Sequence, residues 1–139
     1  MPVGAAGASG LVDELKKTQS KLAEDHLFDY RPWGKYEILS ESEDFKVKVI
    51  TVNPGAQLSY QSHDHRSEHW VVLEGEGQVI LNERTLDVFP GSSIVIPKNS
   101  KHRIKNTGAK KYLRFVEVQT GEYFGEDDIV RYADDYKRT

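Results

Sequence analysis

The stretch SYQSHDHRSEHWVVLEG, residues 59–75, holds three of the five histidines of this chain and decides its fold. Side chains two residues apart in a β-strand lie on the same face, so Gln61 and His63 are predicted to point the same way. Glu68 joins that face only if the chain reverses direction within the polar run DHRS, residues 64–67. We therefore expect two antiparallel strands joined at DHRS. Glu68, Trp70 and Val72 should then face inward together.

Short runs rich in valine, isoleucine and aromatic residues follow one another from residue 36 to residue 119, with glycine, asparagine, proline or charged residues between them. Such runs are typical of strands. The predicted strands cover residues 36–40, 45–52, 57–63, 69–75, 77–82, 85–89, 93–97, 102–106 and 112–119. Short strands with tight connections and no interleaved helix predict an all-β antiparallel sandwich or barrel.

The two ends of the chain differ from this pattern in composition. Residues 1–10 are rich in glycine and alanine, and we expect them to be disordered. Residues 11–29 carry leucines at helical spacing and predict a helical N-terminal extension, which leaves residues 30–139 as the barrel domain. In the acidic tail after residue 120 we expect a turn and a short helix. Asp127 and Asp128 are expected to cap the N-terminus of that helix.

Length, charge and cysteine content exclude several classes of protein. A chain of 139 residues fits one domain with a single core. The net charge of -3 argues against a general nucleic-acid-binding protein, which needs a basic face. The chain has no cysteine, so it has neither disulfides nor thiolate metal ligands. No apolar run approaches the length of a membrane span, and no signal peptide is recognisable. We expect a cytoplasmic protein with neither nucleic acid nor membrane as a partner.

Two motifs stand at defined spacings. Residues 55–75 read G-x5-Q-x-H-x4-E-x6-G, and residues 91–106 read G-x5-P-x-N-x2-H-x3-N. Spacing alone leaves His102 open between a structural and a ligating role, but together the motifs resemble those of the cupin superfamily at every spacing. Gln61 stands where the first motif usually has a histidine, and Asn99 where the second has a glycine. Asparagine tolerates the left-handed conformation that such a glycine provides. A glutamine at the first place is what sugar-phosphate isomerases of the superfamily use.

The resemblance is closer to one family. The segments RPWGKYEIL, LSYQSHDHRSEHWVVLEG, IPKNSKH and VEVQTGEYFGEDDIVRYADDY together resemble the type II mannose-6-phosphate isomerase domain over roughly residues 30–138. In many bacteria that domain is the C-terminal part of a bifunctional enzyme with mannose-1-phosphate guanylyltransferase. The resemblance implies a cupin double-stranded β-helix, which is a jelly-roll barrel. The run DYKR departs from the family, which usually has a glycine before the arginine. The guanylyltransferase half is absent, so we expect no such activity from this chain.

The resemblance also implies a site for one divalent metal ion. It selects four ligands, namely Gln61, His63, Glu68 and His102. An amide oxygen, two imidazoles and a carboxylate suit zinc, and manganese, cobalt, nickel and iron would accept the same set. A competing set consists of the three neighbouring histidines His63, His65 and His69. A metal-free polar barrel is the third interpretation.

Interconversion of mannose 6-phosphate and fructose 6-phosphate moves a proton between C2 and C1 through a cis-enediol. A divalent ion would stabilise the negative charge that develops on the sugar oxygens. A base must also reach the C2 proton. Glu117, in the strand segment FVEVQ, is one candidate, and His65 and Lys98 are the others.

The phosphate group requires cationic donors at the mouth of the barrel. Arg66, in the turn between the metal-binding strands, is the first candidate. Lys98 borders the turn before His102, and the tail would bring Arg131 over the barrel. Ser59 shares a strand face with Gln61 and is assigned to the substrate side.

We therefore predict an isomerase that acts on a phosphorylated hexose and supplies GDP-mannose and surface polysaccharide synthesis. By analogy with other cupins we expect a homodimer. One alternative is a sugar-phosphate-binding module without catalysis. Another is an iron-dependent cupin oxygenase, against which Gln61 argues because such oxygenases generally bind iron through more histidines.

Overall fold

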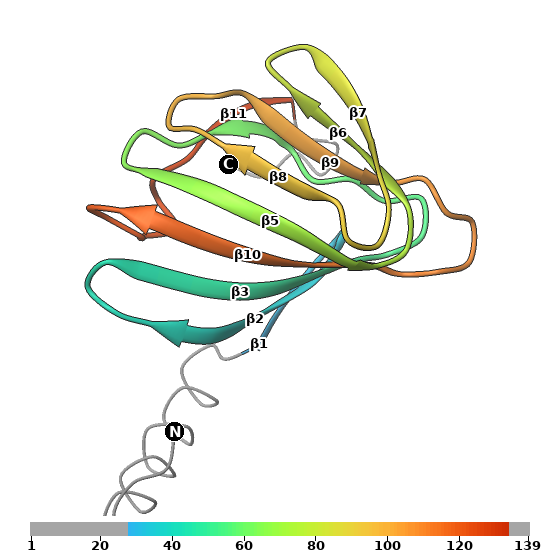
Figure 1. The fold of residues 1–139 in the computed structure, drawn as a ribbon, viewed down its shortest axis with the longest axis horizontal. Coiled ribbons are helices and arrows are strands. Elements are labelled where there is room, and N and C mark those ends of the chain that lie inside the picture. The colour runs from blue at the N-terminus through green and yellow to red at the C-terminus, as the bar shows by residue number, and fades with distance from the viewer. Residues whose placement is uncertain (1–27, 134–139) are drawn as a thin grey trace, which may run out of the picture.

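Two antiparallel sheets face each other in the computed structural model, which describes residues 28–133 (Figure 1). One sheet has six strands in the order β1-β2-β3-β10-β5-β8, and the other has five in the order β11-β4-β9-β6-β7. The strands are β1 (Phe28–Arg31), β2 (Gly34–Glu41), β3 (Phe45–Val52), β4 (Tyr60–Ser62), β5 (Arg66–Glu74), β6 (Gly77–Leu81), β7 (Arg84–Val88), β8 (Ser93–Ile96), β9 (His102–Asn106), β10 (Leu113–Gly121) and β11 (Val130–Ala133). The two motifs thus contribute to both sheets.

All the strands predicted from the sequence are present, with ends that differ by a few residues. The predicted break at DHRS is confirmed, because β4 ends at Ser62 and β5 begins at Arg66. The expected pairing of these two strands is wrong, because β4 lies in the five-stranded sheet and β5 in the six-stranded one. Strands β1 and β11 were not predicted. Asn99 has a φ of 64°, which confirms that this asparagine adopts the left-handed conformation expected of the glycine it replaces.

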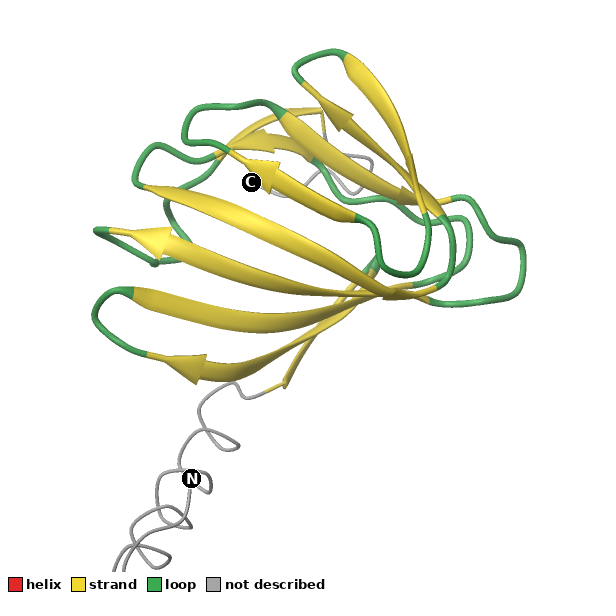
Figure 2. Ribbon diagram, viewed as in Figure 1, coloured by secondary structure: helices red, strands yellow, loops and turns green. Residues whose placement is uncertain are grey.

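The helices expected at the two ends require correction where the structure describes them. Residues 28–29, assigned to a helical extension, belong to β1, and the tail residues 130–133 form β11 (Figure 2). Asp127 and Asp128 therefore do not cap a helix. The remainder of the expected N-terminal helix and the last six residues lie outside the described part of the chain. Between residues 28 and 133 there is no helix that is long and apolar enough to span a membrane.

Alternation along the strands places the core between the two sheets. In β5, Glu68, Trp70 and Val72 are each only 3% exposed, as their common parity predicted. In β10, every second residue from Leu113 to Gln119 is buried. The apolar members of these inner faces pack into one cluster that also includes Trp33 of the β1–β2 turn. Glu68 is thus a carboxylate set between buried Arg66 and the apolar residues Trp70 and Val72 of the same row.

The tail crosses from one sheet to the other. β10 ends at Gly121 in the six-stranded sheet, and β11 pairs antiparallel with β4 in the five-stranded sheet. Residues 122–129 connect them and run past the turn between β4 and β5. The tail therefore lies beside the residues of the first motif.

Two motif glycines give a test of this fold. Gly75 and Gly91 both have positive φ, of 85° and 92°. A Cβ atom added at Gly75 would lie 2.4 Å from the carbonyl oxygen of Tyr112, whereas a Cβ atom added at Gly91 would have no other atom within 4 Å. Gly91→Ala should cost about 1–2 kcal/mol for the left-handed backbone. Gly75→Ala should lower the free energy of unfolding by about 1–3 kcal/mol more because of the overlap. Urea unfolding of both variants measures the difference, and equal losses would contradict the close packing at Gly75.

Candidate metal centre and its cavity

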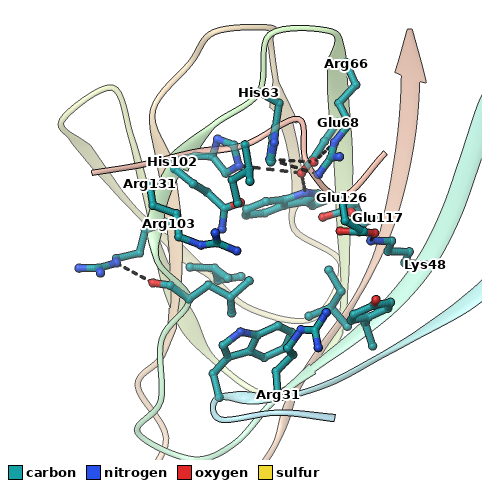
Figure 3. Close-up of a pocket in the computed structure, with 18 residues that line it drawn as sticks. Arg31, Lys48, His63, Arg66, Glu68, His102, Arg103, Glu117, Glu126 and Arg131 are labelled. Carbon is teal, nitrogen blue, oxygen red and sulfur yellow. Dashed lines mark hydrogen bonds and ion pairs between the residues drawn. The ribbon is translucent and has the colours of Figure 1, made fainter. Parts of the chain in front are cut away.

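Three potential metal ligands meet between the two sheets. His63 directly follows β4, Glu68 lies in β5 and His102 begins β9, so both sheets contribute. One ligand atom from each residue lies within 4.8 Å of the others, and all three side chains are buried (Figure 3). The Nε2 atom of His63 is 3.3 Å from Oε2 of Glu68, and Nε2 of His102 is 4.0 Å from Oε1. This cluster brings together three of the four predicted ligands.

Both histidines are held so that the same ring nitrogen is available. His63 Nδ1 lies 2.6 Å from the carbonyl oxygen of Asp128, and His102 Nδ1 lies 2.9 Å from that of Ser100. A carbonyl only accepts, so each Nδ1 carries the proton and each Nε2 keeps its lone pair. Burial lowers the pKa of both histidines, although Glu68 opposes this. Neutral imidazoles with a free Nε2 are the form that binds a metal ion.

Glu68 is held in its ionised form. Burial alone would raise its pKa, but the charge of Arg66 outweighs burial and holds the pKa well below its ordinary value. Arg66 donates from Nε to Oε2 at 2.9 Å, and Trp70 donates from Nε1 to Oε1 at 2.9 Å. A buried carboxylate beside two neutral imidazoles is a donor set that fits a divalent ion.

Gln61 lines the same cavity as the three clustered residues. Its backbone pairs with His102 between β4 and β9. Its side-chain amide nitrogen donates to the carbonyl oxygen and to Oγ of Ser59, each at 3.3 Å. Those bonds occupy the amide nitrogen, so the amide oxygen is the side-chain atom of Gln61 that could coordinate a metal ion. Ser59 is fully buried behind Gln61, so its contact is with the predicted ligand and not with the cavity.

The competing histidine set is not assembled. His65 and His69 are exposed. The ring of His65 lies against Glu122, with Nδ1 3.4 Å from Oε1, and His69 Nε2 lies 2.6 Å from Oγ of Ser93. Among the described residues, His63 clusters with Glu68 and His102 instead.

The cluster forms one wall of a cavity of about 120 Å³. Cationic side chains outnumber acidic ones around it. The cations are Arg31, Lys48, Arg66, Arg103 and Arg131, and the acids are Glu68, Glu117 and Glu126. Arg131 points into the cavity, whereas Arg103 points away from it and donates to the carbonyl oxygen of Leu58 at 2.8 Å (Figure 3). In a chain of net charge -3, this local excess of positive charge favours an anionic ligand.

Glu117 is a second buried carboxyl group in this cavity. It lies in β10, opposite Lys48 of β3, and is 5% exposed. Burial raises its pKa to about 8, with a further increase from the charge of Glu68. The charges of Lys48 and Arg66 oppose the increase. Gln119 donates to Oε2 of Glu117 at 2.6 Å. Glu117 is therefore the candidate base that the structure places in the cavity.

The other candidates have different surroundings. Lys98 is exposed and is not among the residues that line the cavity, and neither is His65. Arg66 is buried, and its Nε donates a hydrogen bond to the carboxylate of Glu68. Its Nη2 lies 3.3 Å from Nε2 of His63. Its Nη1 is also buried and has no hydrogen-bond partner in the described part of the chain. An unsatisfied buried donor costs about 1–3 kcal/mol, so an oxygen atom of a ligand at this point would be favoured.

The sequence analysis missed several residues that line the cavity or form ion pairs beside it. Lys46 and Lys48 of β3 are buried, and both Nζ atoms lie near Oε1 of Glu126, at 3.4 and 2.6 Å. These ion pairs lower the pKa of Glu126 to about 2, against the effect of burial. The signal was the parity of the two lysines, which is that of the core residues Ile50 and Val52. Arg31 gave no such signal, because it lies in a strand that was not predicted.

Curated relatives of this chain include proteins of xanthan and of alginate biosynthesis. It is 46% identical over 129 residues to the xanthan biosynthesis protein XanB of Xanthomonas campestris, and the match covers 93% of this chain and 27% of that protein. It is 44% identical to the alginate biosynthesis protein AlgA of Pseudomonas aeruginosa, with the same coverage. It is 40% identical to the mannose-1-phosphate guanylyltransferase RfbM of Salmonella typhimurium, over 87% of this chain and 25% of that protein. The chain thus spans about a quarter of the length of these curated relatives.

Solved structures agree on the fold. A Klebsiella pneumoniae protein with a double-stranded β-helix domain matches with a TM-score of 0.62 and 21% identity, over 70% of this chain and 78% of that one. KdgF from Halomonas sp. matches with a TM-score of 0.65 and 17% identity, over 75% of this chain and 92% of that one. The two facing sheets are therefore those of a cupin double-stranded β-helix.

The family assignment rests on most of the chain. Residues 18–134 match the family described as "Mannose-6-phosphate isomerase C-terminal". This range includes both motifs, the whole cavity and the tail strand β11. The chain is therefore a member of the mannose-6-phosphate isomerase C-terminal family.

Proposed function

We propose that this domain is a metal-dependent isomerase that interconverts mannose 6-phosphate and fructose 6-phosphate and so supplies GDP-mannose for surface polysaccharides. The observation that carries the proposal is the cavity itself. It joins a buried His-Glu-His cluster, a carboxyl group with a raised pKa and an excess of cationic side chains. The family to which the chain belongs supports the same reaction.

The metal would be one divalent ion, with zinc favoured and manganese, cobalt, nickel or iron as alternatives. Gln61, His63, Glu68 and His102 would hold it. When bound, such an ion supplies Lewis-acid stabilisation of the negative charge that develops on the sugar oxygens. Gln61 adds an oxygen donor without a further negative charge. This choice of ligand preserves the positive charge of the site for the substrate.

Glu117 would carry the proton between C2 and C1. A proton carrier must both accept and release a proton near neutral pH, and a pKa of about 8 suits both steps. Its bond from Gln119 fixes the carboxyl group in the cavity. His65 and Lys98, the other bases considered, lie outside the cavity lining.

The phosphate group would lie among the cationic side chains. Arginine binds phosphate through its planar pair of donors. Arg131 points into the cavity from β11 (Figure 3). The buried Nη1 of Arg66 would donate a hydrogen bond to an oxygen atom of the substrate. We assign Arg131 to the phosphate and Arg66 to an oxygen of the substrate next to the metal.

Removal and replacement of the metal tests the function. A coupled assay for conversion of fructose 6-phosphate to mannose 6-phosphate should give no turnover with chelated protein and recovery after divalent ions are restored. His102→Ala should abolish both metal retention and turnover, and Gln61→Ala should lower metal affinity. His69→Ala is the matched control, since this exposed histidine bonds to Ser93 and should keep its metal.

Each alternative interpretation has its own result in these experiments. Unchanged metal content in His102→Ala, or loss of metal from His65→Ala and His69→Ala, would show that the ligand set is wrong. Binding of the sugar phosphate without turnover by the metal-loaded protein would favour a non-catalytic module. Oxygen uptake by the iron-loaded protein would favour an oxygenase.

Glu117→Gln should retain the metal and lose the reaction. An amide cannot accept the C2 proton, so we expect kcat to fall by about 10²–10⁴-fold. Incorporation of solvent deuterium at C2 should disappear with it. Glu122→Gln is the control, because this exposed glutamate is bonded to His65 and should behave as wild type. Normal deuterium exchange in Glu117→Gln would rule out this assignment.

Arg131→Ala should weaken recognition of the phosphate. Loss of a charge-assisted contact predicts a rise in the substrate KM of about tenfold. Arg114→Ala is the matched control, since Arg114 pairs with Glu74 at an exposed position. A steady-state assay over a range of fructose 6-phosphate concentrations measures both values. Equal KM values in the two variants would place the phosphate elsewhere.

A further inference from the structure

One residue of the tail, Asp128, contacts three consecutive residues of the first motif. Its carboxylate accepts hydrogen bonds from the backbone N–H groups of Asp64 and His65, at 2.9 and 3.0 Å from Oδ1 and Oδ2. Its carbonyl oxygen accepts from Nδ1 of His63 at 2.6 Å. Asp128 is only 7% exposed. These contacts span 63 to 65 residues of sequence.

The contacted segment has few other restraints. β4 ends at Ser62 and β5 begins at Arg66, so His63, Asp64 and His65 lie between strands. In the described part of the chain their backbone accepts two further bonds, from the N–H of Asn99 to the carbonyl oxygen of His63 at 2.8 Å and from the N–H of Glu122 to that of His65 at 3.3 Å. Besides the contact of its Nε2 with Nη2 of Arg66, the His63 ring is held by the bond of its Nδ1 to the tail.

The tail itself is fixed on both sides of Asp128. On one side, Glu126 is paired with Lys46 and Lys48 of the six-stranded sheet. On the other, β11 pairs with β4, and the hydroxyl groups of Tyr132 and Ser62 lie 2.9 Å apart. Asp128 therefore presents its carboxylate and its carbonyl from a position that the barrel sets.

We propose that Asp128 is a positioning residue for the metal site, which holds His63 with its proton on Nδ1 and its Nε2 directed at Glu68 and His102. The proposal rests on the metal site proposed above. The bonds from the N–H groups of Asp64 and His65 fix both oxygens of the Asp128 carboxylate and so the position of its carbonyl group. Groups that orient a ligating histidine through its second nitrogen typically change metal affinity by about 10–100-fold when they are altered.

Asp128→Asn tests the proposal, with Asp127→Asn as the matched control. The asparagine keeps one oxygen but turns an N–H group toward one of the two backbone donors. Asp127 is the adjacent carboxylate, and its side chain bonds to the hydroxyl of Tyr123 instead. Chelator competition with Co²⁺ should give a dissociation constant raised about tenfold or more in Asp128→Asn. In Asp127→Asn the change should stay within about twofold.

A second measurement does not depend on whether the variant folds. Long-range ¹H–¹⁵N spectra of metal-free wild-type protein with labelled histidine should show His63 protonated on Nδ1. A wild-type ring protonated on Nε2 would overturn the proposal. So would a Co²⁺ dissociation constant in Asp128→Asn equal to wild type.

The failure of this proposal is separable from that of the proposed function. If wild-type protein binds no Co²⁺, the metal site itself is wrong. If wild-type protein binds Co²⁺ and both variants bind it equally, the metal site stands and Asp128 has no part in positioning its ligand. If Asp128→Asn is less thermally stable but binds Co²⁺ as tightly as wild type, Asp128 likewise has no part in positioning the ligand.

Discussion

The ionised carboxylate of Glu68, buried between two β-sheets, is the feature around which the rest of this cavity is arranged. An isolated buried charge would cost several kcal/mol or more, so it persists only with charged and hydrogen-bonded partners. Arg66 and Trp70, each two residues away on the same strand face, supply those partners directly. Arg66 is in turn buried and depends on Glu68 for its own compensation. The carboxylate, the guanidinium and the aromatic ring form one interdependent unit.

The same unit explains why two carboxyl groups in one small cavity differ. Glu68 and Glu117 lie on adjacent strands, β5 and β10, and both are buried. The guanidinium of Arg66 is bonded to Glu68, which therefore keeps its charge. Glu117 experiences burial together with the negative charge of Glu68, and its pKa rises to about 8. Groups with pKa values driven apart in this way suit distinct chemical roles.

Strand parity within the first motif was enough to predict the break at DHRS and the inward direction of Glu68 and Trp70. It succeeded because burial alternates along β5, with one face buried and the other largely exposed. Alternation was less informative for β3, because consecutive residues at its C-terminal end are all buried and no single face stands out. The inward direction of Lys46 and Lys48 was therefore not evident from the sequence. The tail was predicted as a helix because its acidic residues suit a helix N-terminus. Glu126 and Asp128 instead bond to distant groups of the barrel, and local sequence carries no information about such contacts.

The four proposed ligands come from both sheets, with Glu68 in the six-stranded sheet and Gln61 and His102 in strands of the five-stranded one. An ion bound there would act as a cross-link through the middle of the sandwich. Ligand binding to the native state alone adds about 1.4 kcal/mol of stability for each tenfold excess of free ion over its dissociation constant. The persistence of the folded domain in a cell would then vary with the supply of that ion. A shortage of the metal would then lower the amount of folded protein through unfolding and degradation, in addition to removing the ion from the cavity.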